Sequence, residues 1–197
     1  MRRKTFDILL TSGGLVVAII LAVAGSLLLW GHNFANSNVR SQLAQQQISF
    51  PAKGSPALAS PEIGRYLNQY AGQQLVTGPQ AKAYADHFIA VHLSEMPYKG
   101  VYAKVSAAAM ADPNNAALKA QVQTVFQGTT LRGLLLEAYA FWQMGQIALI
   151  GAIVSFVMAA VMLVLTGFGF WHLRRVDPAE ELMPQRRSPV PATPAVA

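Results

Sequence analysis

The stretch that decides the fold is the apolar run from Ile147 to Trp171, IALIGAIVSFVMAAVMLVLTGFGFW, which is followed by HLRR. Its 25 residues carry no charge. The hydrocarbon core of a bilayer is about 30 Å thick, and a helix needs roughly 20 residues to cross it. We therefore expect a transmembrane helix over residues 144–173, and Arg174 and Arg175 place its end on the cytoplasmic side.

A second apolar run covers residues 8–30 and follows the basic residues Arg2, Arg3 and Lys4. A secretory signal peptide is the alternative, because Ala22-Val23-Ala24 resembles a cleavage site. The apolar part of a signal peptide is about 7–15 residues long, whereas this run has 23 residues. We therefore expect an uncleaved anchor, with residues 1–7 in the cytoplasm.

Small residues recur at every fourth position in both predicted spans, and neither apolar run, residues 8–30 or residues 147–171, contains an ionisable residue. This spacing allows two helices to approach closely. The spans either pack on each other, which we favour, or one of the grooves binds a foreign helix. Buried charges usually mark ion and proton pathways, so a pump or carrier is disfavoured. The groove residues are Gly14, Ala18, Ala22 and Ser26 in the first span and Gly151, Ser155 and Ala159 in the second.

The net charge of +6 does not indicate a nucleic-acid-binding protein. The basic residues next to the spans are explained by membrane orientation, and those between the spans are scattered among acidic residues. The chain contains no cysteine, which excludes disulfides, thiolate metal sites, cysteine nucleophiles and a lipoprotein anchor.

Residues 31–143 are predicted to form an all-α, extracytoplasmic domain, a bundle of four or five helical segments. Capping residues, glycines and prolines divide the segments. Thr77 and Gln80 match a capping box, and Gly128 is placed to end a helix. The expected segments are Phe34–Gln47, a helix opened by Ser60-Pro61-Glu62, Thr77–Glu95, Tyr102–Ala111 and a helix starting at Asp112-Pro113-Asn114. A last helix, from Thr130, is expected to continue into the second span.

The last helix has no breaker between Thr130 and Arg174, so we expect it to run without interruption into the membrane. Its length at 1.5 Å per residue is about 67 Å. Beyond it, residues 174–197 are rich in proline and poor in large apolar residues, which predicts a disordered cytoplasmic tail. We favour a solvated tail without a binding role. The alternatives are phosphorylation at Ser188 and binding of the proline-rich sequence by a partner domain.

The densest polar cluster lies between Asp86 and Glu95. His87 and His92 are five residues apart, about 140° around a helix, so they do not share a metal ion. His92 and Glu95 are three apart and remain weak candidate ligands, with no third ligand selected. No nucleophile elbow or phosphate-binding loop is present, and we expect no cofactor.

Five stretches carry a resemblance to known sequences: Met1–Asp7, Tyr70–Leu75, Ala81–Ile89, Leu131–Leu136 and Gly169–Arg175. They resemble a family of small actinobacterial two-span membrane proteins, some of which carry the label aromatic ring-opening dioxygenase. The resemblance covers nearly the whole chain except the tail, and it implies two spans around a helical external domain. Dioxygenases of that label hold iron with histidine and carboxylate ligands. This chain offers no comparable constellation, so no functional residue is carried over.

We expect a non-enzymatic accessory or scaffold protein of the cell envelope. Its partners would be the lipid bilayer and either another membrane protein or further copies of itself. A ligand sensor is the first alternative, suggested by the aromatic set Tyr66, Tyr70, Tyr84 and Phe88. A metal-dependent enzyme is the second.

Overall fold

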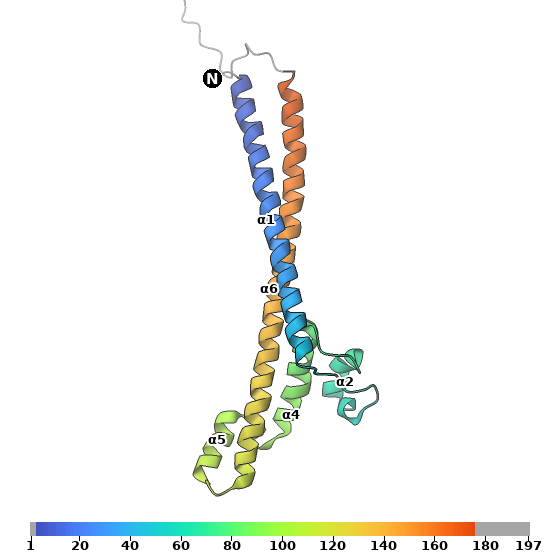
Figure 1. The fold of residues 1–197 in the computed structure, drawn as a ribbon, viewed down its shortest axis with the longest axis vertical. Helices are drawn as coiled ribbons and strands as arrows, with labels where there is room; N and C mark the ends of the chain where they lie inside the picture. Colours follow the sequence, from blue (N-terminus) through green and yellow to red (C-terminus); the bar gives the residue numbers. More distant parts are fainter. Residues whose placement is uncertain (1–2, 176–197) are drawn as a thin grey trace, which may run out of the picture. The chain divides into compact units, whose positions relative to one another are not determined.

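Figure 1 shows the computed structural model, which describes residues 3–175 without the side chain of Arg3. Arg2 and residues 176–197, including Ser188 and most of the predicted tail, lie outside the described residues. Within the described part the chain is helical, and its one β-bridge, Ser49 with Gln74, is isolated. Residues 3–26 and 152–175 form one compact unit, the two-helix unit, and residues 27–151 form another, the helical domain.

Two long helices contribute to both units: α1 spans Arg3–Gln45 and α6 spans Ala116–Leu173. Both are long and apolar enough to cross a membrane, as predicted. In the apolar 18-residue stretch of each helix, which we call its apolar window, only 17% of α1 and 11% of α6 is buried. The segment predicted to begin at Phe34 is not a separate helix, because nothing between the apolar run and Gln45 breaks the backbone ladder.

The predicted helix end at Gly128 is wrong. Gly128 lies inside α6, so the two segments expected after Asp112 and Thr130 are one helix. A Cβ atom at Gly128 would come within 3.0 Å of the Leu93 Cδ2 atom, so the glycine makes room for a neighbouring side chain. The helix begins after Asn115, whose side-chain oxygen accepts a hydrogen bond from the Leu118 amide at 3.1 Å.

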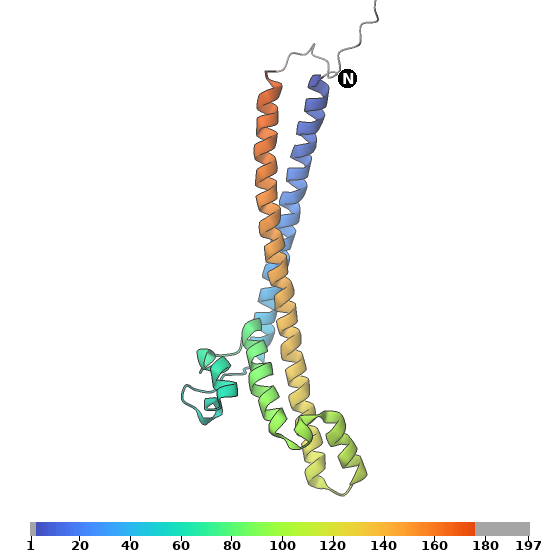
Figure 2. The same ribbon diagram turned by 180° about the vertical axis from the view of Figure 1, so that it is seen from behind.

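In the two-helix unit, α1 and α6 run side by side in both views (Figures 1 and 2). Their buried positions recur every seven residues, the period of a left-handed coiled coil. On α1 and α6 respectively these positions are Thr11, Ala18 and Gly25, and Ala152, Ala159 and Thr166.

The helical domain adds shorter elements between α1 and α6. The α-helices are α2 Pro61–Leu67, α3 Gly78–Tyr84, α4 Ala90–Glu95 and α5 Tyr102–Ala111. The other turns are η1 Pro56–Leu58, η2 Asn68–Tyr70, the π-helical η3 Ala85–Ile89, and η4 Pro97–Gly100.

Local sequence signals explain several of these bounds. The capping box is confirmed: the Gln80 amide donates to the Thr77 hydroxyl, and the Gln80 side chain accepts from the Thr77 amide. The predicted bounds of Tyr102–Ala111 are those of α5. The helix predicted over Thr77–Glu95 ends as expected, but the π turn η3 lies in its middle, which sequence periodicity does not reveal.

Segments α3, η3 and α4 run antiparallel to α6 and cover one side of it, as both views show (Figures 1 and 2). In the middle of this contact Asp86 is bonded to Arg132. At one end Gly78 lies close to Trp142, and at the other end Gly128 lies close to Leu93. The buried core of the helical domain combines aliphatic and aromatic side chains. Its most buried large side chains are Leu43, Leu67, Leu75 and Leu135.

Candidate functional site

The helices of the two-helix unit touch through glycine and threonine. A Cβ atom added to Gly169 would lie 2.6 Å from the Thr11 Oγ1 atom, and one added to Gly14 would lie 2.9 Å from Thr166 Oγ1. The two pairs occur in opposite order along α1 and α6, so the helices are antiparallel. Each glycine lets a threonine side chain rest near the facing backbone, which a larger residue would prevent.

The predicted groove residues are only partly those that make this contact. Ala18 and Ala159 are buried, while Gly14, Ala22, Gly151 and Ser155 are partly buried. Ser26 is exposed, and its hydroxyl donates to the Ala22 carbonyl oxygen of its own helix at 2.8 Å. Thr11, Thr166 and Gly169 also take part in the closest contacts between the helices, and they do not belong to the four-residue repeats of small residues.

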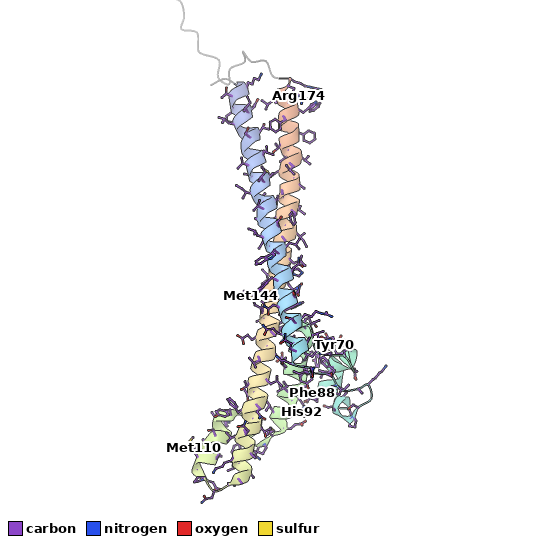
Figure 3. The ribbon with its side chains drawn as sticks, viewed as in Figure 1. Tyr70, Phe88, His92, Met110, Met144 and Arg174 are labelled. Carbon is purple, nitrogen blue, oxygen red and sulfur yellow. The ribbon has the colours of Figure 1, made fainter. Side chains whose placement is uncertain are left out.

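The basic residues predicted to set membrane orientation are Arg2, Arg3, Lys4, Arg174 and Arg175. Lys4 lies in the first turn of α1, and Arg174 and Arg175 follow the last turn of α6, where Figure 3 labels Arg174. The Arg175 guanidinium lies 4.2 Å from the centre of the Trp171 ring, a cation–π contact.

The polar cluster of residues 86–95 does not form a metal site. The His92 Nδ1–H donates to the Phe88 carbonyl oxygen of its own helix at 2.7 Å, and Glu95 is exposed. The His87 ring stacks on Tyr66, with centroids 3.5 Å apart. Within residues 3–175 no three histidine or carboxylate side chains gather closely enough to bind a metal ion.

Asp86 is instead a structural link between η3 and α6. Its carboxylate accepts hydrogen bonds from Lys82 at 2.6 Å and from Arg132 at 3.0 Å. Burial raises the pKa of Asp86, but the bonds and positive charges of Lys82 and Arg132 outweigh it and hold that pKa below its ordinary value. Asp86 is therefore ionised at neutral pH and ties the two helices together.

The aromatic side chains that suggested a ligand site belong mainly to the core. Tyr70, Tyr84 and Phe88 pack against the core cluster, and Phe50 contacts both tyrosines. Figure 3 shows Tyr70 and Phe88 on the side of α1 and α6 that carries α2 and α4. Burial raises the pKa of the Tyr84 phenol, which fits a packed position.

The side of α1 and α6 away from α3 and α4 carries large apolar side chains that are open to solvent. Leu134 is 51% exposed, Phe34 50% and Phe141 37%. The rings of Phe34 and Phe141 meet edge to face, with centroids 6.5 Å apart. Exposed apolar residues gathered in one place commonly mark a site of interaction.

A groove of about 320 Å³ runs between the two helices on this side. Asn38 and Gln42 line it from α1, and Leu134, Glu137 and Phe141 line it from α6. A second hollow continues over Ser41 and Gln45 on α1. We call this surface the open face, defined by Phe34, Asn38, Ser41, Gln42, Gln45, Leu134, Glu137, Ala138 and Phe141.

The open face is not apparent from the sequence. A weak signal is present, because Leu134 and Phe141 follow the i, i+7 spacing of a helix stripe. The next residues along the chain, Leu135 and Trp142, have the same i, i+7 spacing, but they pack into the core of the domain. The sequence alone does not tell which of the two stripes is covered.

Comparison of the chain with protein-family models, with curated proteins and with solved structures found no match. The resemblance to actinobacterial two-span proteins therefore stays a prediction.

Proposed function

We propose that this chain is a two-span protein of the cytoplasmic membrane that acts as an accessory or scaffold protein through protein–protein contacts. Its helical domain would lie outside the cytoplasm, and the contacts would be made by the open face.

Membrane insertion is supported by the surface of the two-helix unit. The central helix of a soluble protein is buried among its neighbours, whereas the apolar windows of α1 and α6 are more than four-fifths unburied. Side chains such as Leu10, Ile20 and Val164 point away from the helix contact. Lipid chains are the medium in which such a surface is stable.

The proposed orientation rests on the basic residues at the ends of the spans. Arg2, Arg3 and Lys4 precede the first apolar run, and Arg174 and Arg175 follow the second. An excess of basic residues marks the cytoplasmic side of a membrane protein. Both termini would then be cytoplasmic, and the domain between them extracytoplasmic.

The observation that carries the proposed function is the exposure of Leu134, Phe34 and Phe141 on one side of the domain. At about 25 cal/mol per Å² of apolar area, covering such side chains is favourable, so a partner surface gains by docking there. The aromatic set that favoured a ligand sensor packs mainly into the core, which leaves protein contacts as the better-supported function.

Cross-linking in native membranes, before solubilisation, tests this proposal. The tagged full chain is purified after cross-linking, and its adducts are identified by mass spectrometry. We expect a stoichiometric protein adduct that Leu134→Lys removes. Met110→Lys serves as a matched control, because Met110 is 74% exposed on α5 (Figure 3), and α5 contributes no residue to the open face. A chain recovered without adducts, or an adduct kept equally by both variants, contradicts the proposal.

A further inference from the structure

A hollow in the two-helix unit lies beside the contact between α1 and α6. Its volume is about 570 Å³, and small-molecule sites commonly measure roughly 300–1,000 Å³. Three glycines line it, Gly13 and Gly14 from α1 and Gly169 from α6. A Cβ atom added to Gly13 would meet nothing within 4 Å, so this part of the hollow is open. Larger apolar side chains, Leu10 and Leu165 among them, line the rest.

The hollow also contains a polar group without a partner. Thr166 lines the hollow and is only 6% exposed, and its Oγ1 atom makes no hydrogen bond to any residue that the structure describes. This atom points toward Gly14, because a Cβ atom added there would lie 2.9 Å from it. Inside a bilayer there is no water to bond such a hydroxyl, so a ligand that brings a hydrogen-bond acceptor into the hollow is favoured.

Basic residues gather at the end of the unit nearest to the hollow. This is the end at which α1 begins and α6 ends (Figures 1 and 2). Residues 1–7 and 172–175 contain five basic residues and one acid, Asp7. Arg3 precedes Leu10 by seven residues, close to two helical turns, so it belongs to the stripe of α1 that lines the hollow. The open end of the hollow therefore suits an anionic group.

We propose that the hollow binds one anionic phospholipid of the cytoplasmic leaflet. One acyl chain lies along the glycines, an ester carbonyl oxygen accepts a hydrogen bond from the Thr166 hydroxyl, and the phosphate lies among the basic residues. Thr166 and Arg174 are about 12 Å apart along the helix, a distance that the glycerol group and a long basic side chain cover together. The inference rests on the membrane insertion proposed above, and it does not need a protein partner.

Two features distinguish this ligand from the surrounding lipid and from a partner helix. An empty hollow would lose van der Waals contacts, so a chain that fills it gains packing that other lipids at the surface lack. Clusters of basic residues on the cytoplasmic side of membrane helices recognise anionic headgroups. An uncharged transmembrane helix would fill the hollow without using the basic residues at its end.

Glycine substitutions give matched variants for the test. Gly13→Leu fills the hollow, whereas Gly167→Leu adds the same side chain at a position that does not line the hollow and where a Cβ atom also meets nothing within 4 Å. Each full chain is purified in mild detergent, mixed with equal amounts of phosphatidylglycerol and phosphatidylcholine that have the same acyl chains, and measured by native mass spectrometry. We expect one phosphatidylglycerol on each parent chain, about tenfold less on Gly13→Leu, and no change on Gly167→Leu.

Further variants test the two polar contacts. Arg3→Gln is expected to lower the preference for phosphatidylglycerol over phosphatidylcholine about fivefold. Arg175→Gln is the control, because its guanidinium lies on the ring of Trp171, about 140° around the helix from Thr166. Thr166→Val keeps the shape of the side chain but removes the hydroxyl, and it is expected to lower the retention of both lipids. The melting temperature of every variant without added lipid is expected to stay that of the parent.

Equal lipid retention by Gly13→Leu and Gly167→Leu, or a parent chain without preference for phosphatidylglycerol, would overturn the inference. A stoichiometric membrane protein, or a second copy of the chain, that replaces the lipid on the parent and is lost only from Gly13→Leu would also overturn it. These results leave the proposed function standing, whereas a chain that a carbonate wash strips from native membranes contradicts both.

Discussion

The two units of this chain use the same two helices but follow opposite packing rules. Within residues 3–26, the buried residues of α1 are small: Thr11, Ala18 and Gly25. Within residues 27–45, its most buried large side chains are Val39 and Leu43. Lipid is as apolar as leucine, so helices in a membrane associate by close approach. Helices in water associate by removing apolar area from the solvent. The buried residues of the two-helix unit are therefore of the kind that packs by close approach, and those of the helical domain are of the kind that packs by removing apolar area from the solvent.

Truncating a large core side chain in the helical domain is expected to have the largest effect. Leu135 is fully buried, so Leu135→Ala loses buried area and leaves a cavity, which costs about 2–5 kcal/mol of stability. Leu134→Ala, at the exposed neighbouring position, is expected to cost less than about 1 kcal/mol. Thermal unfolding of the full chains in detergent measures both. Equal losses would show that the two stripes of α6 are not differently covered.

Enlarging a small residue is expected to be the damaging change in the two-helix unit. Gly169→Val puts methyl groups against Thr11 and costs about 1–3 kcal/mol of helix packing. Gly167→Val is the matched control, because a Cβ atom there meets nothing within 4 Å. Spin labels at Ser12→Cys and Phe168→Cys report the distance between the helices. A longer distance is expected only for Gly169→Val, and the same shift in both variants would refute the close contact.

Removing the charge of Asp86 is expected to have a smaller effect, confined to the helical domain. Asp86→Asn loses the bonds to Lys82 and Arg132, which are partly exposed, and costs about 1 kcal/mol. Because the pKa of Asp86 is lowered in the folded chain, its contribution is present above the unfolded pKa of about 3.9 and is lost as the pH falls through the folded value.

The pH dependence supplies the check on Asp86. Melting temperatures of the parent and of Asp86→Asn are expected to differ at pH 7 and to converge in strong acid. Glu95→Gln, at an exposed carboxylate, is expected to match the parent throughout. A gap between the parent and Asp86→Asn that persists below the pKa would assign the effect to packing, not to charge.

The features that the sequence predicted well are those encoded within a few residues. The capping box at Thr77 is read from two side chains three positions apart, and α5 is bounded by a short alanine-rich run. The two apolar helices are read from length and lack of charge alone. Each of these depends on local chemistry that neighbouring segments do not change.

The features that were missed depend on what packs against a segment. Gly128 has the properties of a helix end, but the approach of Leu93 gives it a place inside α6. Leu134 and Leu135 are both leucines, and the packing of α1 and of the short helices against one side of α6 makes one exposed and the other buried. The open face is therefore a property of the fold, which local sequence patterns do not specify.

Labelling of single cysteines in intact cells tests the central claim, a helical domain held outside the cytoplasm by two spans. A membrane-impermeant maleimide is applied to cells that carry Lys53→Cys, in an exposed loop of the domain, or Ser188→Cys, in the C-terminal region. We expect Lys53→Cys to be labelled in intact cells and Ser188→Cys to be labelled only after the membrane is opened. Labelling of Ser188→Cys in intact cells, or protection of Lys53→Cys, would contradict this claim.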